Sequence, residues 1–290
     1  MRFAVEHSTL VTYSEPAVLG PHTIRMRPRC DTTQSLESWD LRISPAPAGS
    51  FEYIDRDGNA VTRVWWVGRT GSLSIRSSFT VALHRSNPFD FVVFDEPARG
   101  LPPAYPEVER EALRAYLGPA HPAAAALARD VRGGGVTEAA PFLTALTALI
   151  RDRVTYEERA SGAALPVERT LAQGRGACRD LAMVFVEACR AAGIAARFVS
   201  GYQEPQRDDG AGHEEPQHLH AWGEAYLPGA GWRGYDPSQG LAVADRHVAV
   251  AAAALPADAS PTEGTFGPSS VTASLEAGID VLPLPPAGGR

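Results

Sequence analysis

The feature that most constrains the fold is a change in residue pattern near residue 95. Before this point, apolar and polar residues alternate in short runs, the period-2 pattern of half-buried strands. The tripeptide Asp57-Gly58-Asn59 lies between two such runs and predicts a tight hairpin. Several short strands at this spacing predict a β-sandwich over residues 1–95.

Beyond residue 95 the pattern becomes helical. Residues 96–106 contain four prolines and one glycine, a composition typical of a linker. Apolar residues then recur at helical spacing in three segments, 106–117, 122–132 and 139–154. A strongly apolar helix that begins at Cys178 is ended by Gly193, and alternating strands follow. Helices followed by an antiparallel sheet predict an α+β core, to which we assign residues 107–290, with a final strand pair at 271–284 in a C-terminal tail.

The composition is that of a globular protein, with 44% apolar and 21% charged residues. The formal net charge of −7 and the absence of any Lys/Arg run argue against nucleic acid as a partner. The first fifteen residues alternate and carry early charges, so we expect no signal peptide. No stretch approaches the length of a membrane span, and we therefore expect a cytoplasmic protein without a membrane partner.

The cysteines argue against disulfides and structural zinc. There are three, Cys30, Cys178 and Cys189, an odd and sparse set. On one helix, Cys178 and Cys189 would lie roughly 16 Å apart, which is too far for a disulfide. No CxxC pair occurs, so a structural zinc site is not expected.

Cys178 stands where a reactive thiolate would be favoured. It follows the turn Gly174-Arg175-Gly176 and opens the apolar helix. A helix N-terminus carries partial positive charge, which stabilises a thiolate, and its unpaired N–H groups can serve as an oxyanion hole. The position taken alone fits a buried structural cysteine equally well, because cysteine is often a core residue.

His220 and Asp236 supply the other two groups of a possible triad. His218 and His220 would share one face of a strand, but no third residue with metal-ligand spacing is evident, so we expect no metal site. Asp236 follows on the next strand, and neighbouring strands lie about 4.8 Å apart. Its carboxylate could therefore reach Nδ1 of His220 and stabilise the imidazolium. Without that partner, an Asp before Pro237 is an ordinary turn residue.

The sequence around these three residues is more specific. Four segments stand out: GACRDLA at 176–182, AGIAARFVSGY at 192–202, HAWGE at 220–224 and GWRGYDPS at 231–238. They resemble the transglutaminase-like core of the papain-like superfamily, whose members carry a Cys–His–Asp triad on these motifs. The resemblance implies a core of helices packed on an antiparallel sheet, preceded in bacterial relatives by a β-rich region. It also implies Cys178, His220 and Asp236 as the catalytic residues.

The chain departs from the family pattern in several places, one of which is Arg179-Asp180 after Cys178, where relatives often have Gln-Asp. The last motif usually ends Asp-Pro-Thr, whereas this chain has Asp-Pro-Ser and so keeps the hydroxyl. Just past the core, relatives often show a Gly-Arg-Asp-Tyr-like segment, where this chain has Ala252-Ala253-Ala254-Leu255. This last departure affects expected substrate contacts and leaves the triad motifs intact.

The resemblance implies cysteine-dependent acyl transfer or hydrolysis of an amide through a thioester, on a peptide or protein substrate that bears a carboxamide. It implies no cofactor, although calcium dependence, oligomeric state and the choice between hydrolysis and transamidation stay open. Gln173 would donate to the oxyanion and Trp222 would line the acyl site; the alternatives are a solvent-facing amide and an indole that packs on the sheet.

One further expectation concerns the surroundings of the site, and another concerns the function of the whole chain. The acidic loop 203–217 joins the two strands on either side of it and is expected to lie beside the site. The alternative function for the whole chain is a catalytically inactive peptide-binding or scaffold module that keeps the groove. The reactivity of Cys178 discriminates between an enzyme and such a module.

Overall fold

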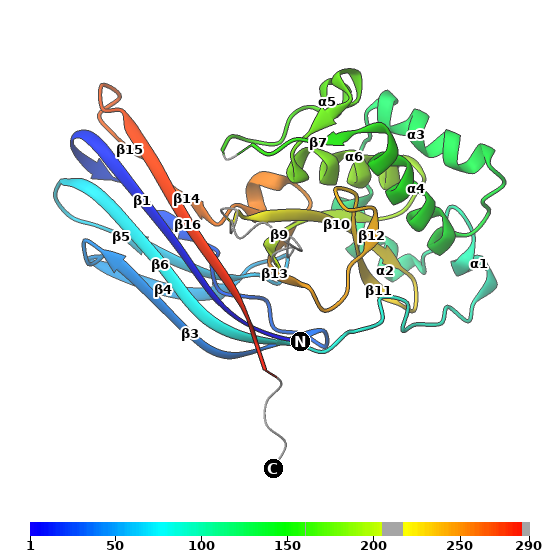
Figure 1. Cartoon of the computed structure of the whole chain (residues 1–290), viewed down its shortest axis with the longest axis horizontal. Coiled ribbons are helices and arrows are strands. Elements are labelled where there is room, and N and C mark those ends of the chain that lie inside the picture. The colour runs from blue at the N-terminus through cyan, green and yellow to red at the C-terminus, as the bar shows by residue number, and fades with distance from the viewer. Residues whose placement is uncertain (160, 205–216, 286–290) are drawn as a thin grey trace, which may run out of the picture.

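A computed structural model of the chain describes residues 1–159, 161–204 and 217–285 (Figure 1). Two β-sheets form one part of the molecule, and helices packed on a third sheet form the other, beside it. This is the predicted α+β fold: an N-terminal β-sandwich followed by a transglutaminase-like core of helices on an antiparallel sheet.

The β-sandwich consists of two antiparallel sheets. One has the order β15-β1-β6-β3 with β16 added on β1, and the other has the order β14-β2-β5-β4. Apolar side chains of both sheets meet between them, among them Tyr13 of β1, Val64 of β5 and Ile75 of β6. The strands are β1 (Arg2–Leu19), β2 (His22–Ile24), β3 (Gln34–Ser44), β4 (Gly49–Ile54), β5 (Ala60–Trp65), β6 (Thr70–Leu83), β14 (Thr262–Glu263), β15 (Phe266–Gly267) and β16 (Ala273–Leu284).

The predicted hairpin at Asp57-Gly58-Asn59 joins β4 to β5. Gly58 has a φ of +80°, a left-handed conformation that glycine adopts without strain. The backbone N–H of Asp55 donates to the carbonyl of Asn59 at 3.0 Å and closes the turn. The pattern of alternation and turn residues therefore located this hairpin correctly.

The C-terminal segment corrects the predicted domain boundary. The sequence assigned everything from 107 to 290 to the core, with a strand pair at 271–284. Instead, β16 is a single strand that pairs with β1 of the sandwich from Arg2↔Leu284 to Tyr13↔Ala273. The physical reason is that β1 has two edges to satisfy: β6 covers one and β16 covers the other. Both ends of the chain therefore build the sandwich.

The core wraps its helices around one face of a five-stranded sheet with the order β12-β11-β10-β9-β13. Helix α6 packs on this sheet so closely that a Cβ at Gly223 of β10 would lie 2.3 Å from Phe185 Cδ1. Among the described residues no helix combines the length and apolarity needed to cross a membrane. The core elements are α1 (Glu96–Arg99), α2 (Glu107–Ala112), η1 (Arg114–Leu117), α3 (Pro122–Gly133), α4 (Ala139–Arg153), β7 (Thr155–Tyr156), α5 (Val167–Gln173), β8 (Arg175–Gly176), α6 (Cys178–Ala191), β9 (Ala196–Gln203), β10 (His220–Leu227), β11 (Gly231–Asp236), β12 (Leu241–Ala242), β13 (His247–Ala253) and η2 (Pro256–Ala259).

Two side-chain amides of the sandwich bond to the outer edge of β13. Gln34 Nε2 donates to the Ala249 carbonyl at 2.7 Å, and Gln34 Oε1 accepts from the Ala249 N–H at 2.9 Å. Asn59 repeats this arrangement on Ala252, at 2.9 Å to the carbonyl and 2.8 Å from the N–H. Because an amide side chain has the donor and acceptor of a peptide group, these two residues stand in for a neighbouring strand.

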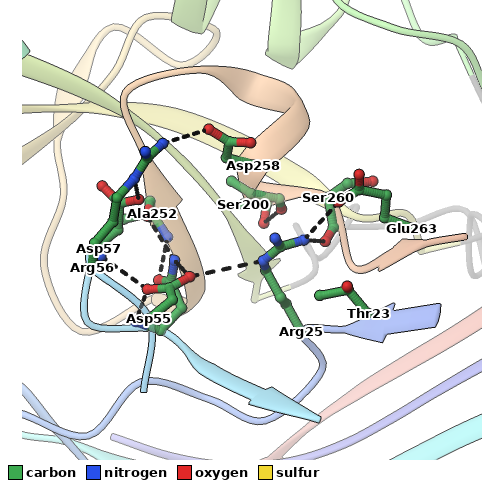
Figure 2. A network of polar contacts seen from close by, with 12 residues as sticks. Thr23, Arg25, Asp55, Arg56, Asp57, Ser200, Ala252, Asp258, Ser260 and Glu263 are labelled. Atoms are coloured by element: carbon green, nitrogen blue, oxygen red, sulfur yellow. Dashed lines mark hydrogen bonds and ion pairs between the residues drawn. The ribbon is translucent and has the colours of Figure 1, made fainter. Parts of the chain in front are cut away.

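Charged residues surround the same junction, as Figure 2 shows. Arg56 of the β4–β5 turn pairs with Asp258 of η2 at 3.0 Å, and Arg25 Nε lies 3.9 Å from Asp55 Oδ2. The Arg56 side chain is 77% exposed, and exposed ion pairs contribute little to stability. The buried amide contacts of Gln34 and Asn59 are therefore the more important polar contacts between sandwich and core.

Apolar side chains complete the contact between the two parts. Phe3, Phe79 and Val81 of the sandwich pack with Val248 and Val250 of β13. The sandwich therefore contacts β13 both through side-chain amides on its backbone and through apolar packing against its side chains.

We expect Asn59→Ala to lower the free energy of unfolding by about 2–4 kcal/mol, because the N–H and carbonyl of Ala252 would lose their partners in a buried place. Equilibrium denaturation measures the loss. The matched control is Asn87→Ala, which removes the same groups at an exposed position and should cost less than about 1 kcal/mol. Equal losses for the two variants would show that β13 does not depend on Asn59.

Candidate active site

Cys178 is the first residue of α6 and is buried. The residue before it, Ala177, has no side-chain oxygen with which to cap the helix. Asp180 partly compensates, since its Oδ2 accepts from the Ala177 N–H at 2.9 Å. Among the hydrogen bonds of the described residues, none uses the backbone N–H groups of Cys178 and Arg179. Two donors are therefore free beside the thiol, as an oxyanion hole requires.

Asp180 fixes the start of this helix in the core. Its carboxylate is fully buried, and Oδ1 accepts from the Leu165 N–H at 2.7 Å and from Arg159 Nη2 at 2.9 Å. One side chain thus joins the N-terminus of α6 to the segment that precedes α5. The position of Cys178 is set by these contacts and by the packing of α6 on the sheet.

His220 and Asp236 lie together as predicted, but through a different ring nitrogen. His220 Nε2 donates to Asp236 Oδ2 at 2.7 Å, whereas the sequence argument placed the carboxylate at Nδ1. The strand register explains the difference: Gly223 pairs with Tyr235, so Asp236 lies opposite Trp222 and approaches His220 diagonally. Cys178 lies close enough to the His220 ring to affect its pKa, and Nδ1 is the ring nitrogen that Asp236 leaves unused.

The charges of these groups follow from burial and hydrogen bonding. Burial alone would lower the pKa of His220, but the hydrogen bond to Asp236 and the nearby Cys178 raise it to about 10. Burial would raise the pKa of Asp236, but hydrogen bonds from His220 and His247 hold it well below its usual range. The site therefore holds an imidazolium beside the Asp236 carboxylate at neutral pH.

His247 belongs to this group and was missed by sequence reasoning. It is the first residue of β13, and its Nε2 lies 3.0 Å from Asp236 Oδ2. The other carboxylate oxygen, Oδ1, accepts from the N–H and the hydroxyl of Ser238 at 2.9 and 2.6 Å. The alternation in HVAVA could have indicated the strand, but the alanines that follow concealed it.

The same residues include a set of metal-ligating types. One ligand atom each from His220, Asp236 and His247 lies within 4.8 Å of the others. No metal site was expected from the sequence because a third residue with metal-ligand spacing was lacking. His247 is such a residue. In the structure these atoms are joined by the hydrogen bonds at 2.7 and 3.0 Å.

The structure shows the surroundings of the two secondary candidates, Trp222 and Gln173. Trp222 is buried and stacks on His220 with ring centroids 6.2 Å apart, and it packs with Val199 and Ala252. It therefore lies inside the sheet packing, as the alternative had it. Gln173 is exposed, and its Nε2 donates to the Arg175 carbonyl at 2.6 Å, so it is engaged with its own loop.

Other expected neighbours are only partly described. His218 lies outside β10 and pairs with Glu158 at 2.5 Å. Most of the acidic loop, residues 205–216, lies outside the described residues. Tyr156, which the sequence did not single out, pairs in register with Gly176 next to the site and is 42% exposed. Burial, with the negative charge of Cys178 adding to it, raises the pKa of Tyr156 to about 12.

Comparison with known proteins agrees with this architecture. The family model described as the bacterial transglutaminase-like N-terminal region matches residues 3–82. The model of the transglutaminase-like superfamily matches residues 125–237, a range that contains Cys178, His220 and Asp236.

Relatives extend along the whole chain. An uncharacterized protein of Mycobacterium leprae is 27% identical over 98% of this chain and 99% of its own length. One of Mycobacterium tuberculosis is 25% identical over 98% and 93%. The crystal structure of a putative cysteine protease from Cytophaga hutchinsonii matches the fold with a TM-score of 0.69, at 18% identity, over 99% of this chain and 92% of that one. Residues 125–237 thus match the transglutaminase-like superfamily, and residues 3–82 match the bacterial N-terminal region that lies ahead of this core.

Proposed function

We propose that this protein is a cysteine-dependent acyl transferase or hydrolase that acts on amides through a thioester on Cys178. The observation that carries the proposal is the buried hydrogen bond between His220 and Asp236, with Cys178 close enough to the imidazole to help raise its pKa. Cys178 also opens a helix whose first two N–H groups have no partner among the described residues. A structural cysteine would need neither the imidazolium nor the free donors.

Each of the site residues has its own role in the proposed reaction. The Cys178 thiolate attacks the carbonyl carbon of a carboxamide, and the N–H groups of Cys178 and Arg179 stabilise the oxyanion. His220 gives the Nδ1 proton to the leaving amine as the C–N bond breaks, which leaves a thioester. Water or a second amine, deprotonated by His220, then attacks the thioester and releases the thiolate. Asp236 keeps Nε2 protonated throughout.

A peptide or protein side chain that bears a carboxamide is the proposed substrate, and no cofactor enters these steps. Tyr156, half exposed beside the thiol, is placed to contact the acyl group. Whether water or an amine accepts the acyl group depends on whether the acceptor side of the site excludes water. Analysis of the products distinguishes hydrolysis from transamidation.

The test is to trap the acyl-enzyme. We expect a p-nitrophenyl ester to release a burst of nitrophenol, about one per enzyme, and an acid quench to leave one acyl group on Cys178. A glutamine peptide should then yield either the acid, with release of ammonia, or an amide to an added alkylamine. Cys178→Ala should show no burst and no adduct. If the wild type also forms no adduct at Cys178, the inactive peptide-binding module is the better account.

A further inference from the structure

Asp236 Oδ2 is shared between two histidines, and only one of them belongs to the proposed triad. His220 Nε2 lies 2.7 Å from this oxygen and His247 Nε2 lies 3.0 Å from it. Both rings are buried, and their centroids are 5.7 Å apart. The reaction described above gives His247 no role, although it contacts the carboxylate directly.

The protonation state of His247 allows its Nε2 to donate a hydrogen bond. Burial lowers its pKa, an effect that the hydrogen bond to Asp236 opposes only in part. The ring is therefore neutral at neutral pH, with its proton on Nε2, where Asp236 accepts it. The other nitrogen, Nδ1, is buried and has no hydrogen-bond partner among the described residues. Within the described part of the chain, the one hydrogen bond that the His247 side chain makes is to Asp236 Oδ2.

We propose that His247 is a positioning residue that fixes the Asp236 carboxylate so that it meets Nε2 of His220 and leaves Nδ1 facing Cys178. The inference rests on the proposed function. Four donors surround the carboxylate: His220 and His247 at Oδ2, and the N–H and hydroxyl of Ser238 at Oδ1. With two donors on each oxygen, the carboxylate cannot rotate without breaking hydrogen bonds, which sets the direction of the His220 ring.

The sandwich takes part in this arrangement through β13. Gln34 and Asn59 bond to the backbone of Ala249 and Ala252 on the same strand that begins with His247. On the other side, the Trp222 ring meets the His247 ring edge-on at 5.2 Å. His247 is therefore held by a strand that the N-terminal domain supports, which gives that domain a part in the geometry of the site.

Two substitutions separate the hydrogen bond from the packing. His247→Gln can place an amide N–H close to the position of Nε2, whereas His247→Phe keeps a ring but cannot donate. The readout is the rate at which iodoacetamide alkylates Cys178 between pH 4 and 9, followed by peptide mapping. It needs no knowledge of the substrate. The titratable groups that act on His220 are Asp236 and Cys178, and those that act on His247 are Asp236 and His220. Tyr156 and Arg179 lie near Cys178 and are the other charged or titratable groups at the site.

We expect His247→Phe to slow alkylation at pH 6 about tenfold and to move the acid-side midpoint of the rate upward, toward that of His220→Ala, because a misdirected imidazolium stabilises the thiolate less. His247→Gln should stay within about twofold of wild type. Thermal unfolding of both variants identifies a general loss of folding. Rescue by Gln at equal stability is a result that packing alone would not give.

Three results would overturn the inference. Wild-type rates and midpoints in both variants would leave His247 as a packing residue. Equal slowing in both, at wild-type thermal stability, would mean that the amide donor does not replace the imidazole. Slowing of the wild type by a chelator, together with one metal ion per chain, would make the cluster a metal site. A wild-type Cys178 that alkylates no faster than Cys30 would instead contradict the proposed function itself.

Discussion

At pH 6, Cys178 should be alkylated faster than either other cysteine, and His220→Ala should slow that reaction by on the order of tenfold to a hundredfold. An ordinary thiol has a pKa near 8.5 and is only about 0.3% ionised at pH 6. In cysteine enzymes generally, an imidazolium beside the sulfur favours the thiolate, although a stabilised thiolate is also somewhat less nucleophilic, which limits the gain. The measurement is iodoacetamide labelling followed by peptide mapping.

The other two cysteines serve as internal controls. Burial raises the pKa of Cys189 well above its ordinary value, so this thiol should stay unlabelled. Cys30 is exposed and free, so it supplies the reference labelling rate in both proteins. Equal labelling of Cys178 and Cys30 at pH 6, or no effect of His220→Ala, would contradict the proposed chemistry.

Asp236→Asn should reduce turnover by on the order of 10²–10³ while the protein still folds. The amide has the shape of the carboxylate but places an NH₂ group where donors already point, so the hydrogen bond to His220 Nε2 or those from Ser238 must be lost. The same change in serine triads costs about 10⁴. We expect less here because a thiolate depends less on its base than a serine hydroxyl does.

The nitrophenol burst and the steady-state rate both measure this loss. The matched control is Asp40→Asn, which makes the same chemical change on an exposed side chain of the sandwich and should leave both rates unchanged. Near wild-type turnover in folded Asp236→Asn would remove Asp236 from the site.

The sequence predicted the parts of the site that local signals describe. Cys178 is marked by the glycine-rich turn and the apolar helix after it, and His220 and Asp236 are marked by alternating strands joined by a short turn. What it could not predict is which ring nitrogen meets the carboxylate. That depends on the register between β10 and β11, which places Asp236 diagonally from His220. The residue types in the two strands do not determine this register.

His247 was missed, and β16 was misplaced, for a related reason. The partners of His247 are Asp236 in the core and, through β13, Gln34 and Asn59 of the sandwich, and these contacts join distant parts of the chain. β16 pairs with β1 across almost the whole chain. Residue patterns indicate that a segment is a strand, but they do not identify the strand beside it.

The pairing of the first strand with the last has a consequence for biosynthesis. About 190 residues separate the end of β6 from the start of β16. At 5–20 residues per second, the ribosome needs roughly 10–40 s to add them. During that time β1 has an unpaired edge that could pair with another nascent chain. We therefore expect the time needed to translate the residues between β6 and β16 to determine how far the nascent chain aggregates and depends on chaperones.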